Sequence, residues 1–226
     1  MKTLKDNWLI FDDEISLAKA LAQEILSIAK ESILKNDYFS IVLTGGQSAL
    51  NLYKILSRSD SDWSKWYIYI GDERFLPEGD KDRNDRIINE IWLENSPIPQ
   101  QNIHFIQVEL GLVEAQKEYE KVLKKINKFD VVLLSMGEDG HVASLFPNHL
   151  YLEDQMVVIE SNSPKPPKQR LSMSYKQFNK SNHILKFIIG ESKQKAVGLL
   201  KKNKNLPITK VTGEREKLYI CKNAIY

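Results

Sequence analysis

The chain has 226 residues, of which 42% are hydrophobic and 27% charged, a mixture typical of a globular protein with a substantial core. Its 32 basic and 30 acidic residues leave a net charge of +2, which gives no reason to expect nucleic acid or an anionic membrane as a partner. The simplest organisation is one domain over residues 1–226. The lone cysteine, Cys221, excludes an intramolecular disulfide, fits a reducing compartment and is expected to be a small buried residue of a strand.

Neither a leader nor a membrane span is expected. The first residues, MKTLKDNWLIFDDE, lack the uninterrupted apolar core of a signal peptide, and no stretch approaches the ~20 apolar residues that a span requires. We therefore expect a cytoplasmic protein that is a monomer or a weak homo-oligomer.

Apolar strands alternate with amphipathic helices along the chain. The first helix is expected over 14–35, where apolar residues recur at helical spacing. Strands are expected at Phe39–Leu43, Trp66–Ile70, 129–134 and 184–189, and further helices at 50–56, 84–94, 113–126 and 192–200. Continuous apolar strands alternating with helices predict an α/β fold with a mostly parallel, Rossmann-like sheet covered on both faces.

The stretch 154–174 breaks this alternation. Two short strands are expected there, at 156–160 and 171–174, and the loop SNSPKPPKQR joins them. We predict a small excursion from the main sheet, which an antiparallel pair would explain.

Polar motifs follow four of the expected strands. Ligands of open parallel sheets bind at the carboxyl ends of the strands, where loops lead into helices. The motifs are TGGQS at 44–48, GDER at 71–74, SMGEDGH at 135–141 and GESK at 190–193. All of them fall at the same edge of the predicted sheet, so we expect one site there.

An anion site is expected around the first of these motifs. Gly45 and Gly46 let backbone N–H groups approach a phosphate, and the candidate contacts around them are Thr44, Gln47 and Ser48. Arg170 and Lys193 could add positive charge. The alternatives are an ordinary strand-to-helix turn and surface cations, because neither a dinucleotide fingerprint nor a Walker loop is complete.

His141 is the best candidate for a catalytic base. It follows a strand and a tight turn, and we expect it near a helix N-terminus, where the macrodipole disfavours the imidazolium. Asp139, Asp72 or a backbone carbonyl could fix its tautomer, and the sequence does not choose among them. Asp72 and Arg74 form either a structural ion pair or part of a site for a polar substrate. Ligand spacing for a metal is not evident.

These motifs resemble those of the 6-phosphogluconolactonases. The resemblance rests on FDVVLLSMGEDGHVASLFP, LTGGQSALNLYKIL, WYIYIGDERFLP with Asn84 beyond it, PKPPKQRLSMS and IIGESK, in the family's order. Local departures are Ser135 where the family commonly has glycine, and Gln47 and Ala49 in the phosphate loop.

The resemblance implies a small-molecule sugar-phosphate lactone as substrate, hydrolysed to 6-phospho-D-gluconate without a metal or organic cofactor. His141 would activate water, Asp72 and Asp139 would orient groups around it, and Arg74 or backbone N–H groups would stabilise the oxyanion. Gly45, Gly46, Arg170 and Lys193 would anchor the phosphate.

Two other functions stay open. A glucosamine-6-phosphate deaminase is the nearest enzyme, but the related deaminases have a glutamate shortly after the histidine, where this chain has SLFP at 144–147. A non-catalytic sugar-phosphate sensor would need the glycines and cations but no neutral base.

Overall fold

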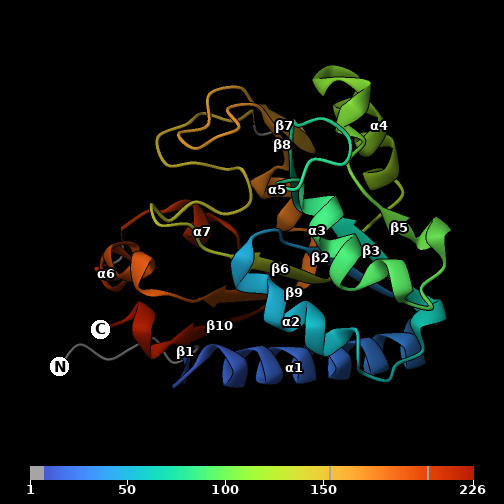
Figure 1. Cartoon of the computed structure of the whole chain (residues 1–226), viewed down its shortest axis with the longest axis horizontal. Helices are drawn as coiled ribbons and strands as arrows, with labels where there is room; N and C mark the ends of the chain where they lie inside the picture. The colour runs from blue at the N-terminus through green and yellow to red at the C-terminus, as the bar shows by residue number, and fades with distance from the viewer. Residues whose placement is uncertain (1–7, 153, 203) are drawn as a thin grey trace.

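A parallel sheet of seven strands forms the centre of the computed structural model, which describes residues 8–152, 154–202 and 204–226 (Figure 1). In spatial order the strands are β1 (Trp8–Phe11), β10 (Arg215–Cys221), β9 (Ser181–Ile188), β6 (Phe129–Ser135), β2 (Phe39–Leu43), β3 (Trp66–Ile70) and β5 (Ile103–His104). Every neighbouring pair is parallel. The predicted parallel sheet is confirmed, and β1 and β5 extend it beyond the strands expected from the sequence.

The central strands are buried on both faces, which explains their mostly apolar sequences; the polar exceptions, Ser40 of β2 and Asp130 of β6, hydrogen-bond to each other at 2.8 Å. All five residues of β2 are buried, and so are the first six of β6. Helices on both sides exclude water from such strands, so no polar alternation is needed. Cys221 is fully buried at the end of β10, as predicted.

Seven α-helices within the described ranges accompany the sheet. They are α1 (Glu14–Asn36), α2 (Leu50–Leu56), α3 (Asn84–Ile91), α4 (Leu112–Leu123), α5 (Tyr175–Phe178), α6 (Gln194–Lys201) and α7 (Pro207–Lys210). Asp13 caps α1 by accepting a 2.8 Å hydrogen bond from the backbone N–H of Ser16. The helix expected over 84–94 ends earlier, at Ile91, and a 3-10 turn follows it.

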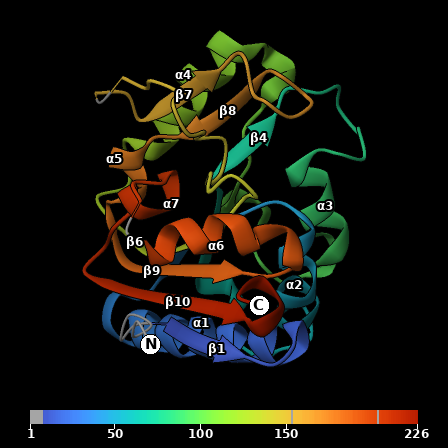
Figure 2. The same cartoon turned by 90° about the vertical axis from the view of Figure 1, so that its left-hand side faces the viewer.

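Helices cover opposite faces of the sheet, as predicted. On β10, Leu218 lines a hollow with Leu200 of α6 and Ile208 of α7, whereas the adjacent Lys217 donates to Glu24 of α1 at 2.7 Å. Because successive residues of a strand point to opposite faces, α1 and the α6–α7 pair lie on different sides. Figure 2 shows α6 and α1 separated by β9 and β10.

A second, antiparallel sheet is formed by β4 (Asp72–Arg74), β8 (Arg170–Met173) and β7 (Val157–Glu160). The predicted excursion with an antiparallel pair is thus confirmed. The third strand differs from the prediction, since Asp72–Arg74 forms a strand rather than a turn. Its sequence has little β-propensity, and tertiary pairing with β8 holds it, beginning with a 2.8 Å bond from Met173 N to Gly71 O.

No helix in the described ranges is long and apolar enough to cross a membrane.

Candidate active site

A cleft of about 280 Å³ opens where the carboxyl ends of β2, β3 and β6 face the second sheet. Ten of the eleven predicted site residues line it: Thr44, Gly45, Gly46, Gln47, Ser48, Asp72, Arg74, His141, Arg170 and Lys193. Asp139, the remaining one, contacts His141. A wider groove of about 950 Å³ lies around Leu150 and Tyr175 and contains none of them.

The His141 ring is held by Asp139. Its Nδ1 lies 2.5 Å from Asp139 Oδ1, and its backbone N–H donates to the same oxygen at 3.1 Å. Burial raises the pKa of Asp139, but the hydrogen bond and charge of His141 outweigh this and lower it to about 2. Asp139 is therefore a carboxylate at neutral pH. A carboxylate only accepts, so a neutral His141 carries its proton on Nδ1 and keeps a lone pair on Nε2.

The turn before His141 needs its glycines. A Cβ on Gly137 would lie 2.0 Å from Cε1 of the His141 ring, so only glycine leaves room for the ring. Gly140 has φ +88°, a backbone conformation that other residues rarely adopt. The prediction of a helix N-terminus at His141 is wrong, because turns and isolated bridges follow β6 as far as Leu145.

Asp72 has a different partner from the one considered in the sequence. It is buried, and its Oδ2 accepts a 2.5 Å hydrogen bond from the hydroxyl of Ser144. Ser144 is the first residue of the SLFP segment, and Phe146 of that segment packs against the His141 ring at 4.6 Å between centroids. Asp139, rather than Asp72, contacts the imidazole.

The glycine loop joins β2 to a 3-10 turn, Gln47–Ala49, and then to α2. Gly46 has φ +90°, and its carbonyl accepts from the N–H of Ala49 at 3.2 Å. The hydroxyl of Tyr53 accepts from Thr44 N and donates to Thr44 O, which anchors the loop to α2. The loop is thus held through its own backbone groups, by Ala49 and by the Tyr53 hydroxyl.

Three cationic side chains gather beside the glycine loop. Arg170 is buried and donates through Nε and Nη2 to the carbonyl oxygens of Pro167, Lys165 and Pro166, each at 3.0 Å. Burial lowers the pKa values of both Arg170 and Lys193. The third is Lys165, which the sequence prediction missed. Its only signal in the sequence was its place in the motif PKPPKQRLSMS, five residues before Arg170.

Glu73 organises the wall that carries Asp72 and Arg74. Its fully buried carboxylate accepts from the backbone N–H groups of Arg74, Asn84 and Asp85 at 2.7–2.8 Å and so caps α3. Burial raises its pKa, and the charge of Asp85 adds to this, while the three backbone N–H groups stabilise the carboxylate and act in the opposite direction. Nothing in the sequence distinguishes this acid from its neighbours.

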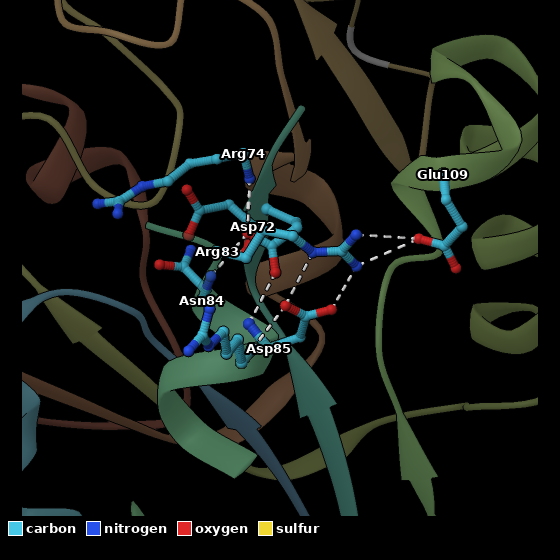
Figure 3. A network of polar contacts seen from close by, with 8 residues as sticks. Asp72, Arg74, Arg83, Asn84, Asp85 and Glu109 are labelled. Atoms are coloured by element: carbon cyan, nitrogen blue, oxygen red, sulfur yellow. Dashed lines mark hydrogen bonds and ion pairs between the residues drawn. The ribbon is translucent and has the colours of Figure 1, made fainter. Parts of the chain in front are cut away.

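Two groups of side chains leave the α3 region in opposite directions (Figure 3). Asp72, Arg74 and Asn84 reach to one side, where they line the cleft. On the other side, Arg83 is paired with Asp85 and Glu109, away from the cleft. Within the described ranges no cluster of three histidine, cysteine or acidic side chains could hold a metal ion.

Comparisons with known proteins agree with this architecture. A family model for Glucosamine-6-phosphate isomerases/6-phosphogluconolactonase matches residues 12–220, and the chain therefore belongs to this family. Among its relatives, "Probable 6-phosphogluconolactonase 2" of Oryza sativa subsp. indica is 34% identical over 209 residues, which are 84% of this chain and 75% of the relative.

Two more comparisons are to 6-phosphogluconolactonases as well. "6-phosphogluconolactonase 3, chloroplastic" of Arabidopsis thaliana is 34% identical over 218 residues, covering 88% of this chain and 67% of the relative. The crystal structure of 6-phosphogluconolactonase from Thermotoga maritima superposes with a TM-score of 0.89 at 27% identity, covering 95% and 99% of the two chains. The family predicted from the motifs is confirmed.

Proposed function

We propose that this chain hydrolyses 6-phospho-D-glucono-1,5-lactone to 6-phospho-D-gluconate, with His141 as the general base. The contact between His141 Nδ1 and the carboxylate of Asp139 carries the proposal. A protein that only binds phosphate needs cations and glycines. An imidazole held as a base at the wall of the same cleft is needed only for proton transfer in catalysis. The names of the relatives support the choice of substrate.

The reaction follows from the two ring nitrogens of His141. Nε2 takes a proton from a water molecule while the oxygen of that water bonds to C1 of the lactone. This addition gives a tetrahedral oxyanion. When the oxyanion collapses, the bond between C1 and the ring oxygen breaks, and the imidazolium returns the proton to that oxygen. Asp139 keeps the ring oriented and stabilises the imidazolium.

Arg74 is the better of the two oxyanion donors considered. In the turn, the N–H groups of Gly137, Gly140 and His141 already donate to oxygens of the turn itself. The Nε of Arg74 is buried without a hydrogen-bond partner, while its Nη1 donates to Asp82 O at 2.7 Å. A guanidinium fixed in this way faces developing charge without reorganising.

The other end of the sugar is anchored by the phosphate. Arg170, Lys193 and Lys165 supply positive charge beside the backbone of Gly45 and Gly46. Contacts remote from C1 convert binding energy into placement of the reacting carbonyl. Buried Arg170 would contact the phosphate through Nη1, because the hydrogens of its Nε and Nη2 are already donated to backbone carbonyls, which fix the plane of the guanidinium.

The deaminase alternative lacks support from the region after His141. The glutamate expected of a deaminase would stand in the segment where this chain has buried Ser144, Leu145 and Phe146. The hydroxyl of Ser144 is committed to Asp72, and Phe146 covers the imidazole. No acid of that segment can assist ring opening.

The test is a lactone-hydrolysis assay of purified protein, with spontaneous hydrolysis subtracted. We expect His141→Ala to lose about 100- to 10,000-fold in kcat, in the range of general-base catalysis. His104→Ala is the matched control, because His104 is half-buried against Tyr69 outside the cleft. Wild-type hydrolysis no faster than the spontaneous rate would refute the proposal, as would equal loss in the two variants.

A further inference from the structure

Asn84, the first residue of α3, has a carbonyl without a partner in the wall of the cleft. The residue is 2% exposed and lines the cleft. Its Oδ1 is one of four buried side-chain atoms in the described ranges that have no hydrogen bond; the others belong to Arg74 and Gln177. An unpaired buried carbonyl is unfavourable for folding, so its retention needs an explanation.

The orientation of this amide is fixed. Its Nδ2 donates to the carbonyl of Asp72 at 3.0 Å, and flipping the amide would place two oxygens against each other. The backbone N–H of Asn84 donates to Glu73 Oε1 at 2.8 Å, so the cap of α3 holds the residue from the other side. Oδ1 therefore cannot turn away to find another partner.

Oδ1 is aimed at the glycine loop. A Cβ on Gly45 would lie 2.0 Å from it, so the amide occupies the space that a side chain there would take. Figure 3 shows the Asn84 amide on the same side as the Asp72 and Arg74 side chains. The oxygen thus lies between the predicted phosphate loop and the charged wall of the cleft.

The chemistry of the oxygen selects its ligand. A carbonyl only accepts hydrogen bonds, and the phosphate, the lactone carbonyl and the ring oxygen of the substrate are acceptors too. Only the ring hydroxyls can donate. We propose that Asn84 Oδ1 accepts a hydrogen bond from the hydroxyl on C2, C3 or C4 of the sugar phosphate, which the lactone and 6-phosphogluconate share, and that Glu73 is the positioning residue for this contact.

This inference rests on the proposed function for the identity of the sugar. It includes a small displacement of the Gly45 backbone when the sugar binds, because Gly45 covers Oδ1 in this structure.

The first test separates the sugar from the phosphate. The dissociation constants of 6-phosphogluconate and of inorganic phosphate are measured by calorimetry for the wild type and Asn84→Ala. We expect 6-phosphogluconate to bind about tenfold more weakly to the variant, the loss of one hydrogen bond, and inorganic phosphate to bind equally well. Unchanged affinity for 6-phosphogluconate, or equal weakening of both ligands, would overturn the inference.

Asn102→Ala is the matched control. Asn102 is buried too, and its Nδ2 donates to a backbone carbonyl, that of Ser64 at 3.3 Å, but it does not line the cleft. We expect it to lower stability without changing either dissociation constant. If Asn84→Ala does not fold, a crystal structure of the wild type with 6-phosphogluconate decides instead: no hydroxyl on C2, C3 or C4 within about 3.5 Å of Oδ1 overturns the inference.

The role of Glu73 is tested by additivity. Glu73→Gln replaces one accepting oxygen with an NH₂ group that faces backbone donors, so the first turn of α3 should shift. We expect it to weaken 6-phosphogluconate binding in the wild type but to add nothing in Asn84→Ala, since both changes remove the same contact. Additive losses would show that Glu73 acts on something other than Asn84.

Lactone hydrolysis distinguishes this inference from the proposed function. A wild type that binds 6-phosphogluconate through Asn84 but does not hydrolyse the lactone would contradict the lactonase and leave the hydroxyl contact standing. An active wild type whose Asn84→Ala variant has unchanged KM and kcat would support the lactonase and overturn the inference about Asn84.

Discussion

The two walls of the cleft are built by different means. The sheet-end wall, residues 44–48 and 135–141, follows β2 and β6 and is shaped by glycines and backbone hydrogen bonds. The antiparallel wall, formed by β4 and the start of β8, carries buried charges held by backbone groups: Glu73 by N–H donors and Arg170 by carbonyls.

This difference divides the work of the site. In the proposed reaction the backbone of the sheet-end wall positions the base, so residues of this wall should affect kcat. Fixed charges of the antiparallel wall would face an anionic substrate, so Arg170 should affect KM, and Arg74 would stabilise the oxyanion.

The largest loss is expected for Asp139→Asn. An amide can donate to Nδ1 of His141, which would put the proton on Nε2 and remove the base; we expect kcat to fall about 1,000-fold. Asp62→Asn is the control, because its carboxylate also accepts from a residue two positions later, the hydroxyl of Ser64 at 2.6 Å, but lies outside the cleft. If steady-state kinetics find the two variants equally active, Asp139 does not set the tautomer of His141.

A smaller loss is expected for Gly137→Ala. The new Cβ meets the His141 ring, which must tilt or shift, and a displacement of about 1 Å costs about 100-fold in kcat. Gly198→Ala in α6 is the control, since a Cβ there meets nothing within 4 Å and should leave kcat unchanged. If kcat is unchanged in Gly137→Ala, the sheet-end wall does not act by fixing the position of the His141 ring.

Arg170→Lys should act on binding. Lysine cannot make the three carbonyl contacts that hold the Arg170 guanidinium and still offer a donor to the phosphate, so we expect KM for the lactone to rise about tenfold with a smaller change in kcat. Arg215→Lys, on the exposed start of β10, should change neither constant. A decrease in kcat without a change in KM would mean that Arg170 acts in the reaction step rather than in binding. The two walls would then not differ in this way.

The smallest effect concerns acid stability. The pKa of Asp139 is lower in the folded chain than its ordinary value of 3.8, so its stabilising contribution is present above that value and is lost as the pH falls toward about 2. The side chain is 37% exposed, which limits the contribution to about 1 kcal/mol.

Urea unfolding at about pH 3 and about pH 6 measures this contribution. The free energy of unfolding should fall less between the two conditions in Asp139→Asn than in the wild type. Identical falls would mean that the pair with His141 does not lower the pKa of Asp139.

The sheet-end wall could be predicted from the sequence, and the antiparallel wall only in part. Apolar strands ending in TGGQS and SMGEDGH place their loops at one edge of a parallel sheet. The partner of His141 stayed open because it depends on the φ of Gly140, and the helix expected there does not form. Asn84 belongs to the family motif, but the sequence does not predict a role for it, because the role depends on its unpaired oxygen in the folded chain.

The antiparallel wall depends on pairing between segments far apart in the chain. Asp72–Arg74 has little strand propensity, and its partner, Arg170–Met173, lies about a hundred residues later, so no local signal predicts β4. The same pairing brings Lys165 to the cleft and makes Glu73 a helix cap.

In the proposed reaction, Asp139 holds His141 with Nε2 free to act as a base. The most direct measurement is ¹⁵N NMR of the imidazole at a pH where His141 is neutral. We expect the proton on Nδ1 in the wild type and its movement toward Nε2 in Asp139→Asn. A wild-type imidazole with its proton on Nε2 would exclude His141 as the base, because no basic nitrogen would then face the lactone.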